Sequence, residues 1–176
     1  MPTPEQRFKM FKMWEKCIKE KHYFVADFWN SGIVSDGCIA YGRGGGYIYI
    51  DWNGNIMPCV FVPYYKDNIF DIYRNGGTVT DALFSDFFIN GRKWQKRYGF
   101  DNDKEKPQNW LMPCSIRDNY KSFKKDIVTD NIIPEDKMAE KAMNDTDYYN
   151  RMIDYDDKYR EITEEYWQKR FLGKRD

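Results

Sequence analysis

One stretch near the middle of the chain limits the fold more than any other feature. Residues 47–50 read Tyr-Ile-Tyr-Ile, and residues 56–62 form a second run rich in β-forming side chains. Between them lies Asn53-Gly54, the dipeptide most typical of a tight hairpin turn, because both of its positions accept positive φ. The segment therefore predicts a β-hairpin. Because Pro58 has no N–H to donate, we expect the second strand to be an edge strand or to contain a bulge there.

Start signals at the N-terminus predict a helix. Thr3 can cap the first turn, Pro4 occupies the favoured first position, and Gln6 completes a capping box. Apolar residues then recur at helical spacing, which predicts a buried stripe on a helix that ends near Lys21. The stripe consists of Met10, Met13, Trp14, Cys17 and Ile18. The aromatic-rich run 23–29 is expected to be extended.

Two more helices are predicted further along the chain. One covers residues 80–98, and its apolar set is Leu83, Phe84, Phe87, Phe88 and Trp94. The other covers residues 147–172, where apolar residues alternate at spacings of four and three. These are Tyr148, Met152, Tyr155, Tyr159, Ile162 and Tyr166. We expect this last helix to dock on the domain rather than to form a free coiled coil. The predicted fold class is α+β: a small antiparallel sheet with cysteine-bearing loops, flanking helices and a C-terminal helical tail.

Composition indicates a folded domain and argues against two kinds of partner. Aromatic residues make up 18% of the 176 residues, which is far more than disordered chains contain. The 28 basic and 28 acidic residues cancel, so no overall field favours nucleic acid or a membrane surface. No signal peptide or spanning segment is visible, and four cysteines without an export signal indicate reduced thiols or metal ligands. We therefore expect a cytoplasmic protein.

Three of the four cysteines lie in predicted loops or at strand ends. Cys38 precedes a glycine-rich segment, while Cys59 and Cys114 each follow a proline, which stiffens the backbone before the sulfur. Such positions allow sulfur atoms from distant segments to converge. There is no C-x-x-C pair, so spacing alone leaves buried thiols and a metal site equally open. Cys17 is different, because its place on the first apolar stripe favours a role in the core.

Several motifs resemble the SPASM/twitch-type C-terminal region of radical SAM proteins. The segments are Gly37-Cys-Ile-Ala-Tyr-Gly-Arg43, Tyr47-Ile-Tyr-Ile-Asp-Trp-Asn-Gly-Asn-Ile-Met-Pro-Cys-Val-Phe61 and Asp67-Asn-Ile69. In that family a cysteine precedes a glycine-containing segment, and a hairpin ending in Pro-Cys carries the next ligand. Later segments, Ser85-Asp-Phe-Phe88 and Leu111-Met-Pro-Cys114, are similar to a helix and a last-ligand segment of the same family. The resemblance covers about residues 2 to 120, and its specific part is 37–69.

The resemblance implies an auxiliary [4Fe–4S] cluster with Cys38, Cys59 and Cys114 as its ligands. It implies an N-terminal helix and linker at 1–30, a cluster-binding domain at 31–120 and a C-terminal helical extension at 121–176. Such a domain supports electron transfer or anchors substrate for a radical SAM reaction. The implied partners are a radical SAM core domain and a peptide or protein substrate. Thiolates suit iron–sulfur clusters, so the residue chemistry agrees with the resemblance.

Two departures from the family pattern limit what the chain is expected to do. The C-x-x-x-C-x-x-C loop that binds the catalytic cluster and S-adenosylmethionine is absent, so we expect no catalysis by this chain alone. Only three cysteines align, which leaves one iron of a cubane cluster without a ligand from the motifs. Cys17, His22, Asp118, the core domain and the substrate all remain candidates for that position.

Other interpretations of the same residues carry less weight. The glycine-rich 42–46 lacks the Lys-Ser/Thr of a phosphate loop and precedes a strand rather than a helix. Asp51, Asn53 and Asn55 alternate as in a calcium loop, but no Glu closes it, so we expect a polar turn. The only histidine, His22, lies at a helix end, where contact with the helix dipole explains it. The alternative function is a metal-free or zinc-bearing module that binds a peptide or protein through an aromatic-rich surface.

Overall fold

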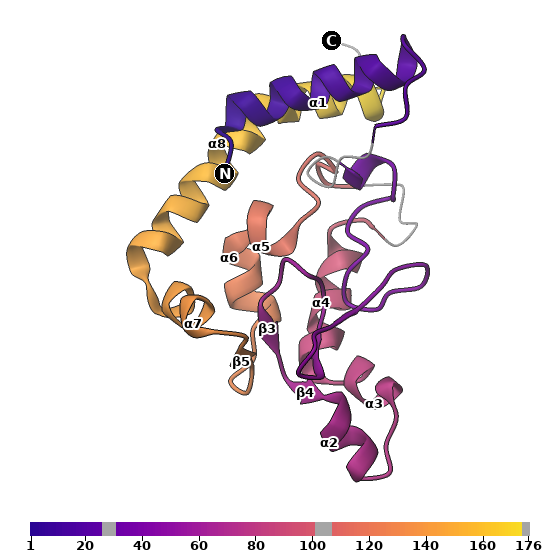
Figure 1. Ribbon diagram of the computed structural model, residues 1–176. Helices are drawn as coiled ribbons and strands as arrows, with labels where there is room; N and C mark the ends of the chain where they lie inside the picture. The colour runs from indigo at the N-terminus through magenta and orange to yellow at the C-terminus, as the bar shows by residue number, and fades with distance from the viewer. Residues whose placement is uncertain (26–30, 101–106, 174–176) are drawn as a thin grey trace.

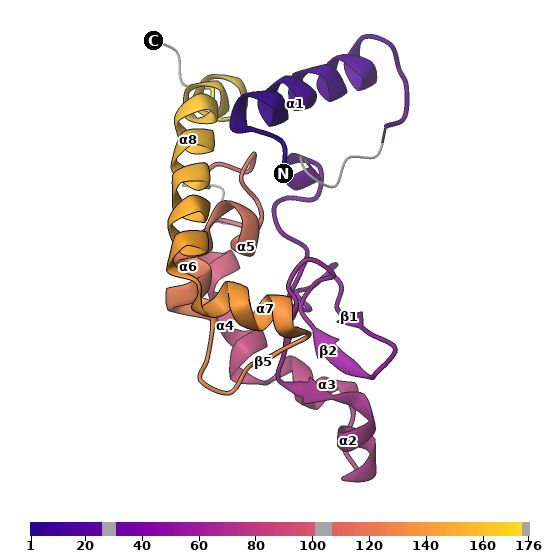
Figure 2. The same cartoon turned by 60° about the vertical axis from the view of Figure 1, so that its left-hand side comes forward.

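The computed structural model describes residues 1–25, 31–100 and 107–173, and it has the predicted α+β architecture (Figure 1). The helices are α1 (Pro4–Lys19), α2 (Ile69–Arg74), α3 (Val79–Leu83), α4 (Asp86–Arg97), α5 (Ser115–Asp118), α6 (Tyr120–Ser122), α7 (Lys137–Asn144) and α8 (Thr146–Phe171). The strands are β1 (Tyr49–Ile50), β2 (Asn55–Met57), β3 (Tyr64–Tyr65), β4 (Asp67–Asn68) and β5 (Ile133–Pro134). α8 extends along one side of the molecule from α7 to α1, and α2 lies at the end opposite α1 (Figures 1 and 2).

The strands form two small antiparallel sheets. The predicted hairpin is present, with Tyr49 opposite Met57, and it is extended by β4 into a three-stranded sheet of order β1-β2-β4. β3 and β5 form the second sheet. The expectation for Pro58 was wrong, because β2 is the central strand and neither an edge nor bulged. β2 instead ends at Met57, so the missing N–H of Pro58 falls just outside the ladder.

The capping box of α1 is confirmed, but its buried face is not the predicted one. The Thr3 hydroxyl accepts from the Gln6 N–H at 3.2 Å, and the Thr3 N–H donates to the Gln6 side chain at 2.9 Å. The predicted stripe is largely solvent-accessible: Met13 is 55% exposed, and Met10 and Ile18 are also exposed. The buried positions are Pro4, Arg7 and Phe11. α1 packs on α8 through this other face, so Cys17 lies outside the core.

The helix predicted over 80–98 is two helices. α3 ends at Leu83, and Ser85 adopts an extended conformation as the N-cap of α4, so the chain turns between them. Phe84, counted in the apolar set of one helix, is consequently 69% exposed. Phe87, Phe88 and Trp94 on α4 are buried as expected.

The C-terminal helix docks as predicted, against α1, α5 and α6. Its buried face is Met152, Asp156, Tyr159, Thr163 and Trp167. The predicted stripe shares only Met152 and Tyr159 with this face. Two of the buried positions, Asp156 and Thr163, are polar, and a hydrophobic pattern cannot reveal them. Neither α8 nor any other helix within the described ranges is both long enough and apolar enough to cross a bilayer.

A buried ion pair joins α1 to the segment that follows Cys114. Arg7 Nη1 lies 2.5 Å from Asp118 Oδ1, and both side chains are 0% exposed. Arg7 Nη2 also donates to the Leu111 carbonyl at 3.0 Å, and its guanidinium stacks 3.9 Å from the centre of the Tyr159 ring. Although burial alone would raise it, the guanidinium groups of Arg117 and Arg7 lower the pKa of Asp118 to about 2.

Removal of one member of this pair should be costly. We expect Arg7→Ala to lower the free energy of unfolding by about 3–5 kcal/mol, since it leaves a buried carboxylate without one of its partners. Arg74→Ala is the matched control, because Arg74 pairs with Asp71 on the surface and should change stability by less than about 1 kcal/mol. Urea unfolding of the two variants measures both values. Equal losses would contradict a structural role for the buried pair.

Asp156 should make the protein less stable as pH rises. Burial raises its pKa to about 8; the hydrogen bond from the Tyr120 N–H opposes this, and Asp118 adds to it. Because the folded pKa exceeds the unfolded value of about 4, the folded state holds a proton that the unfolded state has lost. Stability should therefore fall between about pH 4 and pH 8.

Thermal unfolding across this pH range tests the expectation. Asp156→Asn should flatten the pH dependence and raise the melting temperature at pH 8 relative to the unmodified chain. Asp154→Asn, at an exposed position on the same helix, should leave the slope unchanged. An identical slope in both variants would show that Asp156 is not the titrating group.

Candidate functional site

The loop that carries Cys38 is held by Gly37 and Arg43. Gly37 has φ +98°, and a Cβ there would lie 1.9 Å from the Phe100 ring, so only glycine fits. The Arg43 guanidinium donates to the carbonyls of Ser35 and Phe100, both at 2.8 Å. The side-chain amide of Gln95 on α4 donates to the carbonyls of Cys38 and Ala40. The backbone around the Cys38 sulfur is thus fixed by α4 and the glycine-rich segment.

Cys59 lies two residues beyond β2, where its sulfur accepts from one N–H and lies within hydrogen-bond distance of a hydroxyl. The Tyr47 hydroxyl is 2.8 Å from Cys59 Sγ, and the Phe61 N–H is 3.5 Å from it. Tyr47 lies just before β1, so the hairpin itself brings this hydroxyl beside the sulfur. Since a hydroxyl next to a thiol sulfur can donate to it, Tyr47 is positioned to stabilise a thiolate or a bound metal thiolate.

Cys114 is the N-cap residue of α5. Its N–H donates to Asp118 Oδ2 at 3.1 Å, and its carbonyl accepts from the Asn119 side chain at 3.2 Å. The backbone N–H of Arg117 lowers the pKa of the Cys114 thiol, against the larger effect of burial. Asp118 therefore ties the Cys114 backbone to the buried Arg7 ion pair, and through it to α1.

Tyr41 connects the three cysteine-bearing segments. It lies three residues after Cys38, its N–H donates to the Pro58 carbonyl at 3.2 Å, and its hydroxyl is 2.8 Å from the Ser115 hydroxyl. Its carbonyl accepts from Arg92 on α4 at 2.9 Å. The Tyr41 side chain is fully buried although its φ is +61°, a conformation that costs energy outside glycine. One residue thus joins the neighbours of Cys38, Cys59 and Cys114.

The three thiols lie close enough to influence one another's ionisation. The pKa of Cys38 is raised to about 12, mainly by burial and to a smaller extent by Cys114 and Cys59. Burial also raises the pKa of Cys114 to about 11; Arg117 opposes this shift, while Asp118 and Cys59 add to it. The pKa of Tyr41 is also raised, mainly by burial. The hydrogen bond with Ser115 opposes this shift, and the three cysteines add to it. The thiols at 38 and 114 are therefore neutral at pH 7 unless a cation offsets the charge of the thiolate.

The donor set has the right chemistry for an iron–sulfur cluster. The Phe61 N–H donates to the Cys59 sulfur at 3.5 Å, and the backbone N–H groups of Ala40 and Arg117 lower the pKa of Cys38 and Cys114 against the larger effect of burial. Such N–H···S bonds accompany thiolate ligands of clusters and tune their potential. Among residues 1–25, 31–100 and 107–173, however, no three Cys, His, Asp or Glu side chains stand in an arrangement that could hold a metal ion.

The candidates for a further ligand differ in where they lie. Asp118 is already engaged by Arg7, by Arg117 and by the Cys114 N–H. Cys17 and His22 belong to α1 and the turn after it, and α1 packs on α8 at the end of the molecule away from the hairpin (Figure 2). The structure therefore does not bring these three side chains together with the thiols as free ligands.

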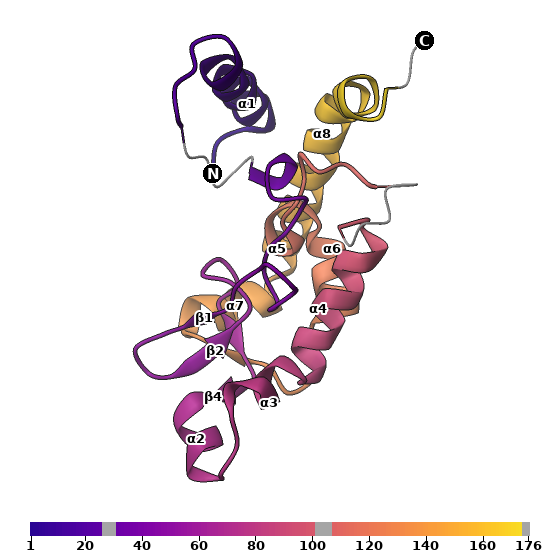
Figure 3. The same cartoon turned by 90° about the vertical axis from the view of Figure 1, so that its right-hand side faces the viewer.

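Two other motifs have structural roles. Asp51 Oδ1 accepts from the N–H groups of Asn53 and Asn55 at 2.8 and 2.9 Å, which is a polar turn rather than a calcium loop. In the glycine-rich segment, the Gly46 N–H donates to the Arg43 carbonyl, so this segment folds as a turn into β1. The hairpin and α4 then face each other across the middle of the molecule (Figure 3).

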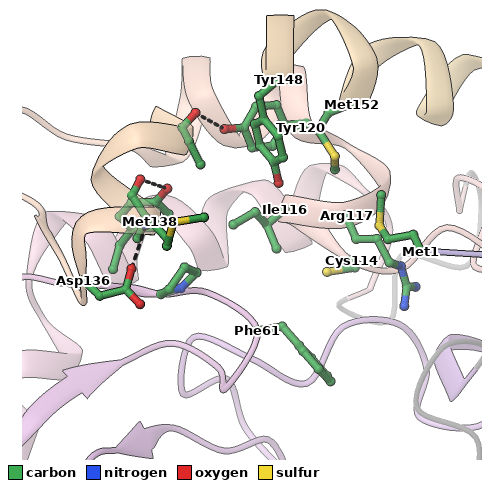
Figure 4. Close-up of a pocket in the computed structure, with 14 residues that line it drawn as sticks. Met1, Phe61, Cys114, Ile116, Arg117, Tyr120, Asp136, Met138, Tyr148 and Met152 are labelled. Carbon is green, nitrogen blue, oxygen red and sulfur yellow. Dashed lines mark hydrogen bonds between the residues drawn. The ribbon is translucent and has the colours of Figure 1, made fainter. Parts of the chain in front are cut away.

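A pocket of about 460 Å³ lies beside Cys114. Its wall combines side chains from the Cys59 loop, α5, α6, α7 and α8, and Figure 4 shows Phe61 opposite Ile116 across the opening. Sequence patterns did not predict this pocket, because its residues range from Met1 to Met152. They also missed Tyr41, Tyr47 and Gln95; a tyrosine three residues after a cysteine was the only local signal.

Comparison with known proteins leaves the site to be judged on its own geometry. The chain matches no protein-family model, and searches of the curated proteins and of the solved structures gave no match either.

Packing around Tyr41 can be tested at Gly91. A Cβ at Gly91 on α4 would lie 2.0 Å from Tyr41 Cδ1, so the ring would have to move. We expect Gly91→Ala to destabilise the protein by about 1–3 kcal/mol, despite the better helix propensity of alanine. Gly44→Ala is the control, because no heavy atom lies within 4 Å of the added Cβ and its effect should stay within about 0.5 kcal/mol. Chemical unfolding measures both, and a neutral Gly91→Ala would contradict the Tyr41 packing.

Proposed function

We propose that this chain is the auxiliary [4Fe–4S] cluster-binding domain of a radical SAM enzyme, with Cys38, Cys59 and Cys114 as cluster ligands. The observation that supports the proposal is that three separate cysteine-bearing segments meet at Tyr41, whose pKa is raised by burial and also by Cys38, Cys114 and Cys59. The motif resemblance over residues 37–69 supplies the identity of the cluster.

Each surrounding group has a definable part in holding such a cluster. When bound, the cluster supplies electron transfer or a binding point for substrate. Tyr47 donates toward the Cys59 sulfur, and the N–H groups near each cysteine face sulfur as well. Arg117 contributes positive charge next to Cys114, which favours the thiolate. These contacts stabilise negative charge on the sulfurs of three partly buried cysteines.

The partner in this proposal is a radical SAM core domain, and the compartment is the cytoplasm, where cysteines stay reduced. Support comes from α1, whose apolar residues Met10, Met13 and Ile18 remain exposed in the described part of the chain. An exposed apolar helix face is typical of a surface that contacts another domain. A peptide or protein substrate would then be modified by the core domain, with this chain in a supporting role.

Anaerobic reconstitution with iron and sulfide tests the proposal. We expect about four iron and four sulfide per chain, with the broad visible absorption of a cubane cluster. Replacing Cys38, Cys59 or Cys114 one at a time by alanine should lower the bound iron to less than half. Cys17→Ala, on α1, should bind as much iron as the unmodified chain.

Two results would count against a cluster. One is a chain that binds no iron under these conditions although circular dichroism shows that it is folded. The other is retention of full iron content in all three single variants. Iron loss in Cys17→Ala alone would move the site to α1 and contradict the assignment of ligands.

A second candidate is a metal-free or zinc-bearing module that binds a peptide or protein. The observation in its favour is a set of exposed aromatic side chains around the hairpin turn and α2: Trp52 is 83% exposed, and Phe70 and Tyr73 more than half. Phe70 packs against Gly54 at the turn, so these rings belong to one surface. Unchanged thermal unfolding with a chelator present would favour the metal-free form, and zinc lost on replacing the same cysteines would favour the zinc-bearing one.

A further inference from the structure

The pocket beside Cys114 is enclosed by parts of the chain that otherwise have little in common. Phe61 comes from the loop after Cys59, Ile116 from α5, Met138 and Ala142 from α7, and Met152 from α8. Its volume of about 460 Å³ falls within the range of pockets that bind small organic molecules. Phe61 and Met138 are 54% and 73% exposed, so apolar side chains stand at its edge with nothing over them in the described part of the chain.

The inner wall is mainly apolar, and two of its three tyrosines, Tyr64 and Tyr120, already use their hydroxyls in hydrogen bonds. The Tyr64 hydroxyl donates to the Ala139 carbonyl at 2.9 Å, and the Tyr120 hydroxyl donates to the Ala142 carbonyl at 3.4 Å. With these hydroxyls bonded to α7, the tyrosines contribute ring carbons to the pocket. Methionine side chains at 138 and 152 are flexible and polarisable, and they adapt to aromatic ligands. Such a wall selects a flat apolar body.

Charge differs between the two ends of the pocket. Figure 4 shows Arg117 and Cys114 at one end and Asp136 at the other. Arg117 and Arg7 both pair with the single carboxylate of Asp118, so this group of three carries one surplus positive charge. Arg7 and Asp118 are 0% exposed, whereas the Arg117 side chain is 14% exposed and lines the pocket.

The surplus charge is not offset by the next buried carboxyl. Burial raises the pKa of Asp156 to about 8, so this group is mostly uncharged at pH 7. At the other end, Asp136 caps α7 by accepting from the Ala139 N–H at 2.8 Å. Its carboxylate would repel an anion and attract a cation. The two ends therefore orient a charged ligand in one direction.

We propose that this pocket binds a small organic acid with an aromatic body, its carboxylate toward Arg117 and its rings between Phe61, Ile116 and Met152. Guanidinium groups bind carboxylates in preference to neutral groups, particularly where water is partly excluded. This inference goes beyond cluster binding and does not rest on it, because the pocket is complete in the protein chain itself. If the iron-free chain binds the acid, the pocket proposal holds whether or not the chain also binds a cluster.

Calorimetric titration of the full chain with naphthalene-2-carboxylate tests the pocket. We expect one site with a Kd of about 0.1 mM. The neutral naphthalene-2-carboxamide has the same rings and should bind about tenfold more weakly, because it lacks the charge that Arg117 selects. Asp136→Asn keeps the helix cap and removes the opposing charge, so it should strengthen binding of the acid about two- to threefold.

Two tryptophan variants on α7 locate the site. Ala142→Trp places a large side chain in the pocket and should weaken binding at least about tenfold. Asn144→Trp introduces the same side chain on the same helix at an exposed position that does not line the pocket, and it should leave the Kd within about twofold. Arg117→Gln should reduce the preference for acid over amide to less than about threefold.

The results that overturn the inference are distinct from these. No heat of binding for the acid, or equal affinity for acid and amide, would remove the proposed ligand class. Equal weakening by Ala142→Trp and Asn144→Trp, or by neither, would place binding outside the pocket. If Arg117→Gln does not fold, the acid–amide comparison, Asp136→Asn and the tryptophan pair still decide between these outcomes.

Discussion

The arrangement of the candidate site depends on one residue, Tyr41, which holds three separate segments together. Its N–H reaches the residue before Cys59, its hydroxyl reaches the residue after Cys114, and it follows Cys38 by three positions. This works only because Gly91 leaves room for the ring on α4 and because Arg92 satisfies the carbonyl. A buried tyrosine with all three polar groups bonded fixes the relative positions of its neighbours far more strictly than apolar packing alone would.

A second set of contacts, among Arg7, Asp118 and Arg117, links the Cys114 segment to the helices α1 and α8. It connects α1 to the turn that begins at Cys114, and Tyr159 on α8 stacks on the Arg7 guanidinium. Two cations of this group pair with one anion, and Arg117 is partly exposed, so a negative charge placed beside Arg117 is favourable. A thiolate ligand at Cys114 and a bound carboxylate at the pocket would each supply such a charge, and both would lie on the Arg117 side of the group.

The two proposals therefore concern neighbouring sites that share one wall. Cys114 belongs to the set of three thiols and also lines the pocket, and Phe61 lines the pocket while its N–H faces the Cys59 sulfur. A ligand in the pocket would lie against the proposed cluster ligands without needing to bind iron. The exposed apolar residues of α1, Met10, Met13 and Ile18, do not line the pocket, so contact with another domain there would not use the same residues.

The sequence by itself determined the features that depend on neighbouring residues. These are the capping box at Thr3, the hairpin at Asn53-Gly54, the extent of the C-terminal helix and the α+β class, since each follows from short-range hydrogen bonding or local periodicity. Only the tertiary structure decided which face of α1 is buried, where α3 and α4 separate and which side of α8 packs inward. These faces include charged or polar residues such as Arg7 and Asp156, whose burial depends on partners more than thirty positions away. The meeting of the three cysteine-bearing segments at Tyr41 and the pocket beside Cys114 are likewise tertiary, because no local pattern specifies contacts between segments so distant in the chain.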